Sequence, residues 1–137
     1  MADTFTTSLN ARKQETGANE NTWGDLLNTD VIDVMDHAIA GNTAISINGG
    51  TDVLTQTQNN SAILDLTGTL LDHQIIQVLN VSKAWIVRNA AAGAFNLTFK
   101  TAGGAASSAV PVGTSLVWCD GANNVYTGLI FAAALAA

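Results

Sequence analysis

The amino-acid sequence predicts a mainly-β protein: an antiparallel β-sandwich or jelly-roll-like barrel of about eight short strands, preceded by an N-terminal arm and one α-helix. Three observations support this fold class. From residue 42 onward, apolar residues recur with a period of two in short runs, and clusters of Gly, Asn, Thr and Ser separate the runs. Only residues 23–40 have the 3.6-residue period of an amphipathic helix. The length of 137 residues corresponds to one domain.

Residues 1–20 are polar with little periodicity, and we expect them to form an arm that is extended or docked on another surface. The segment 21–41 contains the predicted helix, from Trp23 to Ala40. Its apolar residues recur at spacings of three and four: Trp23, Leu27, Val31, Val34 and Ala38, widened by Leu26, Met35 and Ile39. The hydroxyl of Thr22 is predicted to cap the first turn, and Gly41 to end the helix in the left-handed conformation.

Three aspartates, Asp30, Asp33 and Asp36, occur at every third position of the helix, and we expect them to share one face. A helix cannot wrap a Ca²⁺ ion as a loop rich in Asp and Gly does. We therefore interpret the three carboxylates as a stripe that faces solvent or a protein partner, and we expect no metal there.

Residues 42–130 are predicted to form the β-domain. The runs with strand character are 44–48, 52–56, 62–66, 74–79, 84–89, 95–100, 115–119 and 125–130. Gly49-Gly50 is typical of a hairpin turn between the first two runs. The strict alternation of residues 95–100 places Phe95, Leu97 and Phe99 on the buried face.

Two segments of the C-terminal half lack strand character. Residues 101–109 are small and neutral, which predicts a mobile loop, and Pro111 is expected at a sheet edge or turn. Residues 131–137 form an apolar tail without a charged side chain, which we expect to dock against a neighbouring subunit.

The composition excludes several classes of partner. Charged residues are only 12% of the chain, against a usual ~25%, and a small domain with so few charges often hides surface in an assembly. The five basic residues are scattered, so the clustered cations that nucleic-acid binding needs are missing. The longest apolar run, residues 129–137, is far shorter than the ~20 residues that span a bilayer. With no signal peptide at the start, we expect synthesis in a cytoplasm and no membrane partner.

The sequence offers little for catalysis or for a cofactor. Asp72 precedes His73, but the side chains of adjacent residues diverge, and no nucleophile lies in a recognisable elbow. The single cysteine, Cys119, excludes an intramolecular disulfide and a multi-cysteine zinc site, and its apolar surroundings predict a buried thiol. We expect no cofactor, no metal and no enzyme. A small hydrolase that uses Asp72 and His73 or Cys119 is the minor alternative.

The three tryptophans, Trp23, Trp85 and Trp118, are compatible with core packing and with anchoring an interface, because aromatic residues are enriched at the centres of protein contacts. Residues that could contact a partner come from the helix, the tryptophans and the apolar tail. They are Trp23, Leu27, Asp30, Asp33, Trp85, Trp118, Phe131 and Leu135.

Two stretches resemble a known family. Residues 15–28 (ETGANENTWGDLLN) with residues 36–41 (DHAIAG) resemble a module of structural and tail-fibre proteins of tailed bacteriophages. Residues 84–101, which contain AWIVRN and AGAFNLTFKT, and residues 117–121 (VWCDG) are similar to the β-segment that follows in the same proteins. Together the two stretches cover about residues 14–127.

The resemblance implies a non-enzymatic, β-rich and trimeric virion component. Longer fibre proteins continue into a shaft and a receptor-binding tip, whereas here only the apolar tail follows. We therefore expect a capsid decoration (cement) protein or the base of a head fibre, with its own copies and the major capsid or another virion protein as partners. The alternative is a tail-fibre or receptor-binding module that contacts host glycan through Trp85, Trp118 and Tyr126.

Overall fold

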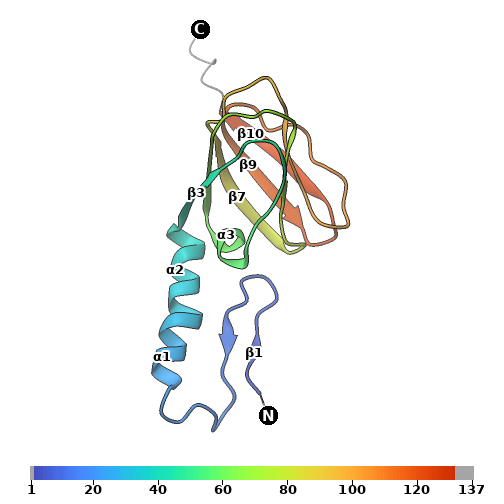
Figure 1. Cartoon of the computed structure of the whole chain (residues 1–137). Helices are drawn as coiled ribbons and strands as arrows, with labels where there is room; N and C mark the ends of the chain where they lie inside the picture. The colour runs from blue at the N-terminus through green and yellow to red at the C-terminus, as the bar shows by residue number, and fades with distance from the viewer. Residues whose placement is uncertain (1, 132–137) are drawn as a thin grey trace.

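The fold is taken from a computed structural model, which describes the backbone of residues 2–131 and the side chains of residues 2–128. Its main body is a pair of facing sheets (Figure 1). The larger has the strand order β10-β9-β7-β5-β3, with bounds Val125–Phe131, Gly113–Asp120, Ser82–Asn89, Ile63–Thr67 and Asn42–Ser46. The smaller has the order β4-β6-β8, with bounds Gly50–Val53, Gln74–Gln77 and Leu97–Lys100. The predicted mainly-β, sandwich-like fold class is confirmed.

The core lies between the two sheets. Alternate residues of each strand point inward, and the largest side chains that are almost completely buried include Trp85, Leu64 and Val117 from the larger sheet and Ile76 and Phe99 from the smaller. Leu97 and Phe99 are buried as predicted. Phe95 is 40% exposed, contrary to prediction, because β8 begins only at Leu97 and Phe95 lies in the preceding turn.

Strand direction differs from the prediction. The chain passes from one sheet to the other in three successive coils, β3–β4, β5–β6 and β7–β8, and the strands that stack on one another within each sheet are parallel. In the larger sheet Asn42 pairs with Ile63, which in turn pairs with Ile86. In these two sheets, only the β7–β9 and β9–β10 pairs are antiparallel among the described strands. The predicted antiparallel topology is therefore wrong for the first three coils.

The hairpin predicted at Gly49-Gly50 is also wrong, because β3 and β4 belong to different sheets. Both glycines have positive φ, +116° and +89°, and they turn the chain through a corner instead of folding it back on itself. The amide of Gly50 then donates to the carbonyl of His73 in the next coil (2.9 Å), so the corners of adjacent coils are linked as well.

One helical rod precedes the β-domain, as predicted. It consists of α1 (Trp23–Leu27), the π-helical turn η1 (Asn28–Ile32) and α2 (Asp33–Ala40). Its ends differ from the prediction. The Thr22 side chain makes no capping hydrogen bond, and Gly41 is extended with φ −69° because the chain leads directly into β3.

The N-terminal arm is docked on this helical rod. It forms a small antiparallel hairpin of β1 (Thr4–Phe5) and β2 (Arg12–Lys13). Figure 1 shows the hairpin beside the lower part of the helix, and both extend beyond the β-domain. We call residues 2–40 the stalk.

A short helix, α3 (Gln56–Asn60), follows β4 and was not predicted. Its signal is nevertheless in the sequence, because Thr55 and Gln58 form a capping box: the Thr55 hydroxyl accepts from the Gln58 amide and the Gln58 side chain from the Thr55 amide. The predicted strand 52–56 extended to Gln56, whereas β4 ends at Val53 and Gln56 begins the helix.

Candidate functional site

The helical rod leaves an apolar face uncovered. None of the residues of α1, η1 or α2 is buried. The exposed fractions are 58% for Trp23, 51% for Ile32, 49% for Met35 and 77% for Ile39. In Figure 1 the hairpin and the β-domain lie on one side of the rod, and no element within residues 2–131 covers its outer side. Several large exposed apolar side chains on one short element mark an interaction site.

The covered side of the rod is held by Arg12 of the hairpin. The Arg12 Nε donates to Asp30 Oδ2 at 2.7 Å, and its Nη1 donates to Asp3 Oδ2 at 2.8 Å. The guanidinium also lies 5.0 Å from the centroid of the Phe5 ring. One cation therefore joins the start of the chain, the hairpin and the helix.

Asp3 accepts the hydrogen bonds that organise this contact. Its carboxylate accepts from the Glu15 amide (2.9 Å), the Arg12 guanidinium and the Asn19 side chain (2.8 Å). The Glu15 amide, followed by Arg12 and Asn19, holds the pKa of Asp3 below its ordinary value of 3.8. The carboxylates of Asp3 and Asp30 raise the pKa of Arg12.

Acidification should therefore loosen the hairpin. The pKa of Asp3 is lower in the folded protein than its ordinary value of 3.8. The contribution of Asp3 to the stability of the hairpin contact is therefore complete above pH 3.8 and is lost as the pH falls through the pKa of the folded state. We expect the side-chain amide resonances of Asn19, whose Nδ2 donates to Asp3, to be constant near neutral pH and to shift below pH 3.8. Asp3→Asn should abolish that transition, and Asp72→Asn, in an exposed turn, should preserve it. A transition that survives in Asp3→Asn would contradict the assignment.

The upper end of the rod is joined to the β-domain through His37. Its Nε2 lies 3.1 Å from the Thr57 carbonyl oxygen and 2.7 Å from the Ser61 Oγ, which is 2.6 Å from the Thr43 Oγ1. A histidine beside a serine hydroxyl resembles half of a catalytic triad. Ser61 is completely buried, so this hydroxyl is not open to a substrate, and the contact positions the helix on α3.

A groove lies between the hairpin and the rod. Its volume is about 510 Å³. Most of its apolar lining comes from Leu9 and Ala11 of the hairpin and from Val31 and Met35 of the rod, and Lys13 also lines it. Lys13 takes part in no ion pair among the described residues.

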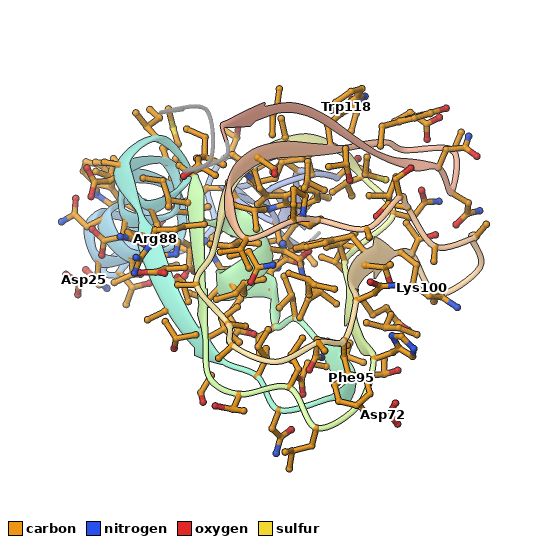
Figure 2. The ribbon with its side chains drawn as sticks, turned by 90° about the horizontal axis from the view of Figure 1, so that it is seen from above. Asp25, Asp72, Arg88, Phe95, Lys100 and Trp118 are labelled. Carbon is orange, nitrogen blue, oxygen red and sulfur yellow. The ribbon has the colours of Figure 1, made fainter. Side chains whose placement is uncertain are left out.

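A second surface lies on the outer face of the larger sheet. The rings of Trp118 and Tyr126, on neighbouring strands, are stacked with centroids 5.4 Å apart and planes inclined by 25°. A side chain added at Gly128 would meet the Trp118 ring at 3.1 Å, so the glycine leaves room for it. Tyr126 is 44% and Ile86 48% exposed. Figure 2 shows Trp118 at the periphery, where its ring faces outward from β9.

The structure separates the predicted interface residues into four groups. Trp23 and Leu27 lie on the rod, exposed and half-buried respectively. Trp118 lies on the outer sheet face. Trp85 is 1% exposed, so its prediction as an interface anchor or sugar platform is wrong and it is a core residue. The Phe131 side chain and all of Leu135 lie outside the described residues.

The predicted acidic stripe is divided. Asp30 is bound to Arg12, Asp33 lines a cavity beside His37 and Thr57, and Asp36 is exposed. The physical reason is the π turn (Asn28–Ile32), which contains Asp30 and is wider than an α-helical turn, so the rotation around the rod from Asp30 to Asp33 differs from that in a regular α-helix. Sequence reasoning also missed Ile32, which the spacing of three and four to Met35 and Ile39 could have placed on their face.

The residues considered for hydrolysis hold local structure. The Asp72 carboxylate accepts from the backbone amide of His73 at 2.7 Å, and the His73 Nδ1 accepts from the Asn96 amide at 3.1 Å. The His73 ring also contacts Phe95 edge-on, with centroids 5.6 Å apart. Cys119 is buried as predicted, with 2% exposed.

Among residues 2–131 no group of three or more His, Cys, Asp or Glu side chains could hold a metal ion. In the same part of the chain, no helix has the length and hydropathy required to cross a membrane. The chain matches no protein-family model, no curated protein and no solved structure.

Proposed function

We propose that this protein is a non-enzymatic structural component of a bacteriophage virion, a capsid decoration protein or head-fibre base that binds the shell as a homotrimer. The observation that carries the proposal is the helical rod, which exposes four large apolar side chains and buries none of its residues. The sequence resemblance of residues 14–127 to phage virion modules supplies the biological context.

The physical advantage of such a protein lies in binding the assembled shell and not its free subunits. Its binding free energy then adds to the stability of the shell by mass action. A trimer binds through several weak contacts at once, and the second and third contacts form at a high effective concentration. The low proportion of charged residues, 12%, suits a surface that is covered in the assembly.

Size-exclusion chromatography with light scattering tests the proposal. We expect a particle of three times the chain mass, because the exposed apolar face of the rod is costly in water. A strictly monomeric protein at high concentration would contradict it. Immunogold labelling of intact virions then tests the position, and label confined to the tail would exclude a capsid protein.

The stacked pair of Trp118 and Tyr126 favours a second candidate, a receptor-binding module that contacts host glycan. Trp118 is half-buried and Tyr126 is 44% exposed, and the stacked pair presents an aromatic surface against which a sugar ring can pack. The test is retention on immobilised host-surface polysaccharide by the protein and by Trp118→Ala. Equal retention of both proteins, or none, would exclude this candidate.

A further inference from the structure

We infer that the groove between the hairpin and the helical rod of one copy receives a ridge on the rod of the next copy. The ridge consists of Ile32, Asp36 and Ile39. This inference rests on the proposed self-association and names the surfaces that produce it.

The groove has the shape and chemistry of a receptor for apolar side chains. Leu9 and Ala11 form one wall, and Val31 and Met35 form the other. Met35 is 49% exposed although it lines a concave surface, so the chain's own residues leave the groove partly open. The groove volume of about 510 Å³ exceeds the volume of a single side chain, so the groove can receive more than one side chain of a protruding helix face.

The ridge has the shape and chemistry to fill this groove. Ile32 and Ile39 are seven residues apart, which places them two turns apart on one face of the rod. They are 51% and 77% exposed, and Ile39 is the most exposed large apolar side chain of those described. Asp36 lies between them, four residues after Ile32 and three before Ile39, so its carboxylate forms the polar part of the ridge.

The charges of the two surfaces are complementary. The rod carries Asp25, Asp30, Asp33 and Asp36 and neither Lys nor Arg. In the hairpin, Arg12 is already bound to Asp3 and Asp30, whereas Lys13 makes no ion pair among residues 2–131. A ridge inserted into the groove brings Asp36 towards Lys13, which lines the groove. Lys13 and Asp36, neither of which forms an ion pair with another described residue of the same copy, thus meet between two copies.

The stalk of each chain carries both the groove and the ridge. The partner that brings a ridge to the groove is therefore a second copy of this chain. A contact of the groove of one copy with the ridge of the next is heterologous, and such contacts close into a ring when the rotation between copies is suitable. In the proposed trimer each stalk gives one ridge and one groove, and no ridge remains in water. This arrangement explains why the rod can remain uncovered within a single chain.

Charge reversal tests the contact. Lys13→Glu and Asp36→Lys should each raise the dissociation constant of self-association at least about tenfold, because like charges then meet. The double variant K13E/D36K restores opposite charges and should return to within about threefold of the unchanged protein. Sedimentation equilibrium measures the constants, and circular dichroism verifies that each variant keeps the helix. Lys100→Glu and Asp25→Lys, which make the same charge changes away from groove and ridge, are the matched controls and should leave self-association unchanged.

Ile39→Asp adds an independent test, because it places a charge at the most exposed point of the ridge and should abolish self-association without unfolding the β-domain. If the protein is oligomeric and neither the charge reversals nor Ile39→Asp alters its mass, the inference is wrong and the proposed function stands. If the unchanged protein is monomeric, the proposed function fails as well. Loss of shell binding by Ile39→Asp with an intact oligomer would assign the ridge to another virion protein and would overturn the inference.

Discussion

Trp85→Ala is expected to lower the free energy of unfolding by about 3–5 kcal/mol, the usual range for removing a large aromatic side chain from a core. Trp85 is 1% exposed in the centre of β7. Its indole Nε1 donates to the backbone carbonyl of Asn59 at 2.8 Å. The substitution leaves a cavity between the sheets and a buried carbonyl without its donor.

Urea unfolding followed by circular dichroism measures this change, at one protein concentration for all variants because self-association also contributes to stability. Trp23→Ala is the matched control. Trp23 is 58% exposed, and its removal should change the stability of the β-domain by less than about 1 kcal/mol. Trp85→Phe keeps most of the volume and loses the donor, so it separates packing from hydrogen bonding. Equal effects of Trp85→Ala and Trp23→Ala would show that the core assignment is wrong.

Asn59→Ala is expected to be the second most destabilising change, by about 2–4 kcal/mol. The Asn59 side chain is 1% exposed at the end of α3. Its Nδ2 donates to the carbonyls of Leu54 (3.1 Å) and Thr55 (3.0 Å), and its Oδ1 accepts from the amide of Leu79 (3.0 Å). Alanine leaves one buried donor and two acceptors without these bonds, and the first and second coils lose a link.

The same unfolding experiment applies, with Asn42→Ala as the control because Asn42 is exposed at the start of β3. Asn59→Asp is a second informative variant: it keeps the acceptor for Leu79 but places a carboxylate at a 1% exposed position against the carbonyl oxygens of Leu54 and Thr55. Near neutral pH it should therefore destabilise the protein at least as much as Asn59→Ala. A loss no larger for Asn59→Ala than for Asn42→Ala would exclude the linking role.

The candidate site was predictable in part. The apolar period of residues 23–40 predicts a helix with one apolar stripe, and the rod exposes Trp23, Met35 and Ile39 of that stripe. What the pattern could not supply is which side of the rod the rest of the chain covers. The side of the rod that the hairpin covers depends on Arg12, which is 18 residues from its partner Asp30 in the sequence but forms a hydrogen bond with it in the structure.

Local periodicity in the sequence determined the mainly-β class, the extent of the helix and the inward-facing residues of most strands, because side-chain alternation depends only on neighbouring residues. Three other features were decided by the tertiary structure alone: the parallel stacking of the coils, the burial of Trp85 against Asn59 and the uncovered side of the rod. Each of these depends on contacts between residues far apart in the chain. The same alternating strand can pair with a neighbour in either direction, and only the path of the whole chain selects one.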